Sequence, residues 1–241
     1  MAHAEAAVWL QVHDRLLAAF GHQDWWPGDS PFEVMVGAVL TQNTAWSNVE
    51  KAIANLKAAR ALSCPAILAM PPEELARHIR PAGCYNVKTH RLLTLCRFLR
   101  DAGVARDPIR LAQAFPVREL RARLLAVHGV GEETADSILL YALELPSFVV
   151  DAYTRRIFGR LGLLTGHERY AGIQACFHRH LPADVALYNE YHALVVALGK
   201  GVCRPRPRCA ACALADMCPR ADGARTADFA PPARARGRSP A

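Results

Sequence analysis

Apolar residues recur at helical spacing along most of the chain, and no segment shows sustained alternation of apolar and polar residues between hairpin turns. This pattern predicts an all-α fold. Ser30 followed by Pro31 predicts an N-cap with proline in the first turn of a helix. The predicted helices span residues 5–20, 31–43, 46–59, 73–80, 86–102, 108–113, 117–127, 132–144, 151–162, 169–180 and 184–199.

Length and composition favour a folded protein without a membrane span. The chain has 241 residues, of which 52% are apolar, so it can bury a core as one domain or two small ones. No apolar run reaches the roughly 18 residues of a membrane span, and no signal-peptide pattern is present. We expect a soluble, cytoplasmic protein.

The formal charge of +7 favours a polyanionic partner such as DNA. Several arginines lie in residues 219–241, which are rich in Ala, Arg and Pro and have little to bury. We predict that this segment is a disordered basic tail.

The most specific motif is LLAVHGVGEETADSIL, residues 124–139, which matches the helix–hairpin–helix pattern of apolar and glycine positions. Its apolar residues can pack two short helices together, and its glycines allow a tight turn to which a nucleic-acid backbone can come close. The predicted DNA contacts are His128, Gly129, Val130 and Gly131. The alternative is an ordinary helical hairpin with a glycine-rich turn.

Four of the eight cysteines crowd into a short segment with the spacing C-x5-C-x2-C-x5-C. In a protein without a secretion signal, such a cluster indicates a metal site rather than a disulfide pair. Four thiolates can hold either a [4Fe–4S] cluster or tetrahedral zinc. The predicted ligands are Cys203, Cys209, Cys212 and Cys218.

The segments VLTQNTAW (39–46), the hairpin, FVVDAYTRRIFGRLG (148–162) and the cysteines occur in the order seen in helix–hairpin–helix DNA glycosylases. Over roughly residues 20–218 the chain resembles the endonuclease III branch of that superfamily. The resemblance implies a two-lobed α-helical fold, with DNA bound across the cleft. It assigns 26–134 to a six-helix barrel lobe, and 1–25 with 135–218 to a second lobe that ends in an iron–sulfur loop.

Asp151 matches the aspartate that this family uses for catalysis. Cleavage of the bond between sugar and base develops positive charge on the sugar, which a carboxylate can stabilise while it orients an attacking water. The alternative is that Asp151 only caps the following helix, since Asp is a favoured N-cap residue.

Glu133 occupies the hairpin position where bifunctional members of the endonuclease III branch have a lysine. That lysine forms a Schiff base and leads to strand cleavage, which a carboxylate cannot do. We therefore predict a monofunctional glycosylase without AP lyase activity. Lys88 and Lys200 are the nearest lysines in the sequence, and neither lies in the matching motif. The alternative for Glu133 is a solvated acid in the first turn of a helix.

A mismatch-specific adenine glycosylase is excluded by a second comparison. Those enzymes carry a catalytic glutamate four positions before their Gln-Gln-Thr motif. Here Gln42-Asn43-Thr44 fills that motif, and the glutamate position falls on Ala38.

Three of the four tryptophans, Trp25, Trp26 and Trp46, lie near the start of the predicted barrel lobe. Together with Glu133 they are the predicted base pocket, because aromatic rings can replace the stacking that a flipped base loses. An electron-rich indole also attracts positively charged alkylated purines. The alternative is that the tryptophans belong to the core. Gln42 is expected to fill the gap left in the duplex.

Within that branch the chain is similar to the 3-methyladenine DNA glycosylase III subgroup. This similarity rests on the segments WWP (25–27), TQNTAW (41–46), GEETAD (131–136) and VVDAYTRRIF (149–158). The first gap between cysteines is one residue shorter than in endonuclease III, which keeps zinc as the alternative to [4Fe–4S]. That gap holds three predicted DNA contacts, Arg204, Arg206 and Arg208.

The resemblance therefore implies a monomeric base excision repair enzyme, associated with the nucleoid, that binds double-stranded DNA containing a damaged base. We predict excision of alkylated bases, with 3-methyladenine as the expected substrate. The alternatives are an endonuclease III-type glycosylase for oxidised or mismatched pyrimidines and a noncatalytic protein that binds lesions.

Overall fold

The computed structural model describes residues 2–221, with side chains from residue 6 onward, and its regular elements are all helical. The predicted all-α class is confirmed, and the predicted basic tail lies outside the described residues from residue 222. The longer helices are α1 (Ala2–Phe20), α2 (Pro31–Leu40), α3 (Trp46–Ala58), α6 (Tyr85–Asp101), α8 (Val117–Leu125), α10 (Ala152–Arg160), α11 (Tyr170–His180) and α12 (Val185–Gly201). The shorter ones are α4 (Cys64–Ala69), α5 (Pro72–His78), α7 (Leu111–Ala114) and α9 (Glu132–Ser137), with 3-10 turns at Arg80–Ala82, Pro108–Arg110, Cys209–Ala211 and Ala215–Met217.

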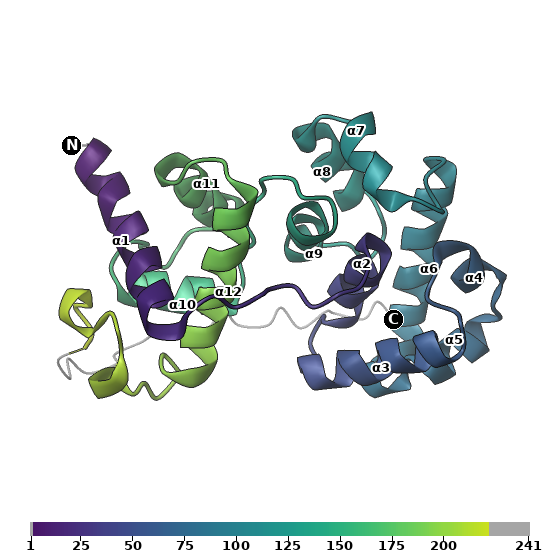
Figure 1. Ribbon diagram of the computed structural model, residues 1–241, viewed down its shortest axis with the longest axis horizontal. Coiled ribbons are helices and arrows are strands. Elements are labelled where there is room, and N and C mark those ends of the chain that lie inside the picture. Colours follow the sequence, from purple (N-terminus) through teal and green to yellow (C-terminus); the bar gives the residue numbers. More distant parts are fainter. Residues whose placement is uncertain (1, 222–241) are drawn as a thin grey trace, which may run out of the picture.

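The helices form two groups (Figure 1), and each group packs around its own hydrophobic core. One core is built from α2 to α9, which we call the barrel lobe. The other is built from α1 and α10 to α12 with the C-terminal cysteine loop, which we call the terminal lobe. The predicted lobe boundary at residue 134 stays a prediction, because the segment that follows it contributes to both cores.

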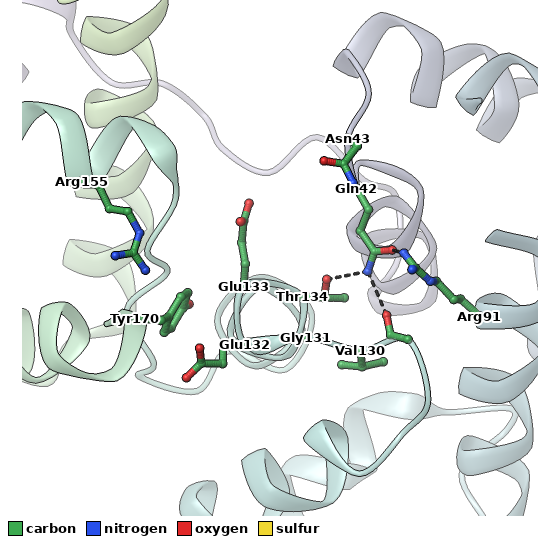
Figure 2. Close-up of a pocket in the computed structure, with 11 residues that line it drawn as sticks. Gln42, Asn43, Arg91, Val130, Gly131, Glu132, Glu133, Thr134, Arg155 and Tyr170 are labelled. Atoms are coloured by element: carbon green, nitrogen blue, oxygen red, sulfur yellow. Dashed lines mark hydrogen bonds between the residues drawn. The ribbon is translucent and has the colours of Figure 1, made fainter. Parts of the chain in front are cut away.

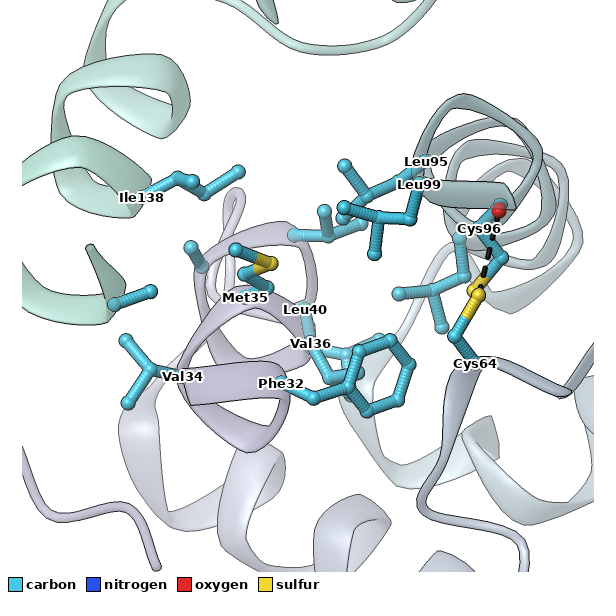
Figure 3. Packing of buried hydrophobic residues seen from close by; sticks show 14 of the residues in the cluster. Phe32, Val34, Met35, Val36, Leu40, Cys64, Leu95, Cys96, Leu99 and Ile138 are labelled. Carbon is cyan, nitrogen blue, oxygen red and sulfur yellow. Dashed lines mark hydrogen bonds between the residues drawn. The ribbon is translucent and has the colours of Figure 1, made fainter. Parts of the chain in front are cut away.

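Helix α2 forms the centre of the barrel lobe. Ser30 caps it, since its Oγ accepts a hydrogen bond from the backbone N–H of Glu33 at 3.2 Å, and Pro31 follows as predicted. Almost every residue of α2 is buried, including Met35 and Leu40, against α6 and the segment after α9 (Figure 3). A helix that is apolar on all sides is stable only when other helices surround it, and α2 therefore fixes the position of its C-terminal end.

The sequence pattern missed α4. Ser63 caps this helix by accepting from the N–H of Ala66, and a proline lies in its first turn. These are ordinary start signals, but the helix has only six residues, too few for apolar periodicity to stand out.

The helix predicted over 132–144 is regular only as far as Ser137. The chain then makes a π-helical turn over Ile138–Ala142, closed by the Leu143 N–H to the carbonyl of Ile138 at 3.1 Å. Ile138 is buried in the barrel core and Leu140 in the terminal core. The wider turn thus lets one short segment serve both lobes.

In residues 2–221, no helix is long and apolar enough to span a membrane.

Candidate active site

Asp151 lies at the start of α10, in the terminal lobe. Its Oδ1 accepts hydrogen bonds from the backbone N–H of Thr154 at 2.7 Å and from the Thr154 hydroxyl at 2.9 Å. Thr154 Oγ1 also accepts from the backbone N–H of Asp151 at 3.4 Å, which completes a capping box. Asp151 therefore caps α10, which was the alternative expected from the sequence. The same bonds fix the carboxylate and leave Oδ2 for other partners.

The environment of Asp151 favours its ionised form. Its side chain is only 11% exposed, and Oδ2 lies 3.6 Å from Nε2 of His192, which is longer than a hydrogen bond. Burial by itself would raise the pKa of Asp151, but the interactions with His192 and Thr154 outweigh it and hold the pKa below its usual value.

The pKa of Glu133 is shifted in the opposite direction, upward. It lies in α9 and its side chain points into the open space between Arg155 and Gln42 (Figure 2). Although the residue is accessible to solvent, the surrounding protein removes enough hydration to raise the pKa of Glu133 to about 6. The charge of Asp151 adds to this rise, and His192 and Arg155 oppose it. The site thus contains two acids with pKa values displaced in opposite directions.

The predicted base-pocket tryptophans lie together, as an aromatic cluster with Tyr141. The ring centroids are 5.0 Å apart for Trp26 and Trp46, 5.1 Å for Trp26 and Tyr141, and 5.5 Å for Trp25 and Trp26. All three indoles are half-buried. The ammonium of Lys200 lies 5.8 Å from the centroid of a Trp25 ring, so one indole face already has a cation beside it.

A cleft of about 560 Å³ runs along the hairpin, and Figure 2 shows the side chains around it. It is lined by Gln42, Asn43, Arg91, Gly129, Val130, Gly131, Glu132, Glu133, Thr134, Arg155 and Tyr170. The cleft brings the hairpin, Glu133 and Gln42 together, whereas the tryptophans do not line it.

Gln42 is bound to the hairpin. Its Nε2 donates to the carbonyl of Gly129 at 3.1 Å and to the hydroxyl of Thr134 at 2.9 Å, and its Oε1 accepts from Arg91. Gln42 would have to leave these partners in order to enter a DNA duplex. Its expected role in DNA therefore stays a prediction.

The two glycines of the hairpin serve different purposes. Gly129 has φ +87°, and a Cβ there would lie 2.3 Å from the Arg91 side chain, so only glycine fits. Gly131 has open space where a Cβ would be, which leaves its backbone free for close approach by a partner. His128 is exposed beside this turn, and its ring centroid lies 5.4 Å from that of the exposed His90.

The four C-terminal cysteines form no disulfide among the described residues. Each is half-buried, and Cys203, Cys212 and Cys218 pack against the core of the terminal lobe. Arg160 of α10 donates to the Sγ of Cys203 at 3.2 Å. Among the described residues, no three Cys, His, Asp or Glu side chains are close enough to share one metal ion. Arg204, Arg206 and Arg208 are exposed on the loop between Cys203 and Cys209.

Lys88 is buried, and its side chain bonds to the protein backbone. It is 2% exposed, and its ammonium donates to the carbonyls of Leu40 at 2.8 Å and Ala82 at 2.7 Å. Burial lowers the pKa of Lys88. The bond to Leu40 holds the end of α2, two residues before Gln42, against α6, and the bond to Ala82 holds the 3-10 turn before α6.

Sequence reasoning missed His192, Tyr141 and Thr154. Thr154 could have been found, because an aspartate at the N-cap accepts a hydrogen bond from the backbone N–H of the second or third helical residue, and Thr154 is the third. His192 comes from α12, 41 positions after Asp151, and no local pattern connects the two residues.

Comparisons with known proteins agree with this architecture. Residues 36–182 match the family model described as HhH-GPD superfamily base excision DNA repair protein. The chain is 45% identical to a candidate DNA repair glycosylase of Methanocaldococcus jannaschii over 209 residues, which cover 86% of this chain and 94% of the relative. It is 30% identical to endonuclease III of Thermotoga maritima over 190 residues, which cover 78% and 82%.

Solved structures show the same fold. A noncovalent endonuclease III–DNA complex superimposes with a TM-score of 0.77 at 22% identity, covering 90% of this chain and 97% of that one. The H. pylori 3-methyladenine DNA glycosylase bound to 1,N6-ethenoadenine superimposes with a TM-score of 0.67 at 27% identity, covering 83% and 97%.

Proposed function

The chain belongs to the HhH-GPD superfamily of base excision DNA repair proteins, and we propose that it is a monofunctional DNA glycosylase that excises alkylated bases by Asp151-assisted hydrolysis. The observation that carries the proposal is Asp151 itself. It is a buried carboxylate that its partners keep ionised, at the start of α10 and close enough to Glu133 for their charges to interact.

The chemistry follows from this charge. As the bond between sugar and base breaks, positive charge develops on the sugar ring, and a fixed anion in a poorly hydrated site stabilises it. Because Oδ1 is held by Thr154, the carboxylate needs no reorganisation when that charge appears. Oδ2 is the oxygen left to face the sugar or an attacking water.

Glu133 supplies the second acid. With a pKa of about 6, it can exchange a proton near neutral pH, either with the leaving base or with the attacking water. A carboxylate at this hairpin position cannot form a Schiff base, and Lys88 is committed to two backbone carbonyls. These observations favour base removal without strand cleavage.

The aromatic cluster favours a base that has left the stack, because Trp25, Trp26 and Trp46 can provide stacking surface. The similarity to the H. pylori 3-methyladenine DNA glycosylase, at 27% identity, supports an alkylated purine, and we propose 3-methyladenine as the principal substrate. One observation favours a second candidate. Lys200 lies over Trp25 and disfavours a second cation there, which suits a neutral oxidised or mismatched pyrimidine as in endonuclease III.

Four cysteines that lie close together in the chain can hold either a [4Fe–4S] cluster or tetrahedral zinc, and the similarity to endonuclease III favours the cluster. We propose that Cys203, Cys209, Cys212 and Cys218 hold such a cluster and that it shapes the loop of Arg204, Arg206 and Arg208 for phosphate contacts. The cluster takes no part in hydrolysis.

We further propose that the protein acts as a monomer on double-stranded DNA, in the cytoplasm with the nucleoid. The hairpin from His128 to Gly131 would contact the DNA backbone on one side of the damaged base.

The test is a profile of free bases released from two duplex DNAs, one methylated and one carrying oxidised or mismatched pyrimidines, with Asp151→Asn as the control. Release of 3-methyladenine by the wild type alone supports the alkylation proposal. Release from the second DNA only would overturn it in favour of pyrimidine lesions. Lesion binding without any release would indicate a noncatalytic role.

Strand cleavage is tested separately by borohydride trapping on an abasic duplex. We expect no covalent complex. A trapped complex that disappears in Lys200→Gln would contradict the monofunctional assignment and identify the amine.

A further inference from the structure

A buried histidine that no motif connects to the site lies against Asp151. His192 is 5% exposed, and its Nε2 has no hydrogen-bond partner among the described residues, although Oδ2 of Asp151 is 3.6 Å away. Its other ring nitrogen, Nδ1, lies 2.5 Å from the hydroxyl of Tyr141. A buried polar atom without a partner is costly, so its retention next to Asp151 calls for an explanation.

Tyr141 determines which nitrogen of His192 carries a proton. Burial, together with the nearby charge of Asp151, raises the pKa of Tyr141 well above its ordinary value, so the phenol stays neutral and has one proton to donate. When the Tyr141 hydroxyl donates to Nδ1, the imidazole proton must lie on Nε2, which faces Oδ2. The opposite tautomer would aim the Nε2 lone pair at a carboxylate and is disfavoured electrostatically.

We propose that His192, oriented by Tyr141, is a positioning residue that presents its Nε2–H to Oδ2 of Asp151 when DNA is bound. The proposal rests on the proposed function, because it gives Asp151 a role in catalysis. The present separation of 3.6 Å exceeds a hydrogen bond of about 2.7–3.2 Å, and such contacts often shorten only in the substrate complex.

The arrangement explains how a buried carboxylate remains an anion. Thr154 satisfies Oδ1, and the Nε2–H of His192 would satisfy Oδ2 once the separation of 3.6 Å shortens, so that the two residues together replace the water that burial removes. The π-helical turn after α9 carries Tyr141 to α12, and such turns are common at functional sites. The π-helical turn, α12 and α10 thus form one chain of contacts from Tyr141 through His192 to the carboxyl group of Asp151.

Other charged groups also face this site and must be kept constant in a test. They are Glu133 from α9 and Arg155 from α10, and Lys200 of α12 lies nearby over the ring of Trp25. Because Glu133 also titrates, the pH dependence of the rate alone would mix two acids, and a direct probe of Asp151 is required.

The direct experiment follows the carboxyl-carbon chemical shift of Asp151 by NMR as pH is lowered, in the wild type and in Tyr141→Phe, His192→Phe and His192→Gln. The pKa of Asp151 should rise by about one unit, a tenfold change in proton affinity, in Tyr141→Phe and His192→Phe. It should return towards the wild-type position in His192→Gln, because the glutamine amide can offer a donor near the place of Nε2. The ring-nitrogen shifts of His192 should report the Nε2–H form in the wild type and lose it in Tyr141→Phe.

Tyr191→Phe is the matched control. Tyr191 is the residue before His192, and its buried hydroxyl donates to the carbonyl of Trp9 at 2.7 Å, away from Asp151. Its removal should cost stability without moving the Asp151 titration. If Tyr191→Phe moves the titration as much as Tyr141→Phe does, the effect is structural and the proposal fails.

Activity supplies the second readout. Tyr141→Phe should slow single-turnover base release about tenfold, with DNA affinity within about twofold of the wild type. An Asp151 titration that is identical in the wild type, Tyr141→Phe and folded His192→Phe would overturn the proposal, even if bases are released normally. A shifted titration in a protein that releases no base would instead keep the positioning role and overturn the proposed function.

Discussion

Asp151 and Glu133 are both carboxylic acids near the start of a helix, yet their pKa values are shifted in opposite directions. Asp151 is almost buried and would be neutralised by burial alone, but Thr154 and His192 keep its pKa low. Glu133 is accessible to solvent, yet the surrounding protein removes enough hydration, with the charge of Asp151 adding to the effect, to raise its pKa to about 6. The comparison teaches that the partners of a carboxylate, more than its exposure, decide its charge in this site.

The difference matches a division of labour. A permanent anion suits the stabilisation of positive charge on the sugar, whereas a group that titrates near neutrality suits proton transfer. The predictions below are ordered from the largest expected effect to the smallest.

Replacing Asp151 by Asn removes the anion while keeping its shape. Single-turnover base release should fall by at least about 10²–10³-fold, because the developing charge loses its counter-ion. DNA affinity and folding should be preserved, since Asn is also a good N-cap residue. Base release and fluorescence-anisotropy binding measure the two effects, and release at more than a tenth of the wild-type rate would contradict the assignment of Asp151.

Glu133→Gln should slow release by about 10²-fold if Glu133 transfers a proton. The wild-type rate should show an inflection near pH 6 that is absent in Glu133→Gln, because the titrating group is gone. Rates measured between pH 5 and 8 test this. Persistence of the inflection at full strength would show that another group produces it.

Thr154→Ala should remove the capping box and destabilise the protein by about 0.5–2 kcal/mol at neutral pH, with a smaller effect on activity. The pH dependence has a definite sign. Because the pKa of Asp151 is lowered in the folded state, its stabilising contribution is present above the unfolded-state pKa and is lost as pH falls through the folded value.

Urea unfolding of the wild type and Thr154→Ala between pH 7 and pH 3 measures this contribution. The gap in unfolding free energy between the two proteins should narrow at the acidic end. A gap that is constant with pH would mean that Thr154 stabilises the helix without affecting the ionisation of Asp151.

Glu132→Gln is the matched control for Glu133→Gln and should have the smallest effect. Glu132 is the preceding residue of the same helix, is exposed, and lies 3.8 Å from Arg121 in a weak surface ion pair. Stability should change by less than about 1 kcal/mol and release by less than about twofold. If Glu132→Gln slowed base release as much as Glu133→Gln does, the effect would come from a general disturbance of the hairpin and not from the carboxyl group of Glu133.

Much of the fold could be predicted from the sequence because its signals are local. Apolar spacing located every helix that has nine or more residues, and Ser30 with Pro31 marked the start of α2. The short α4 and the π-helical turn after Ser137 were not predicted, because six residues carry too little periodicity and a π turn depends on the packing of both lobes.

The sequence by itself determined the helical class, the hairpin glycines and the carboxylates at Asp151 and Glu133, since each depends on residue type at a fixed spacing. Only the tertiary structure decided that Tyr141 contacts His192 and His192 faces Asp151, that Gln42 is held by the hairpin and that Lys200 lies over Trp25. The physical reason is that ionisation and hydrogen bonding depend on distances of a few ångströms between side chains. Those distances are set when α12, α10 and the segment after α9 pack together, and no local pattern in the chain encodes them.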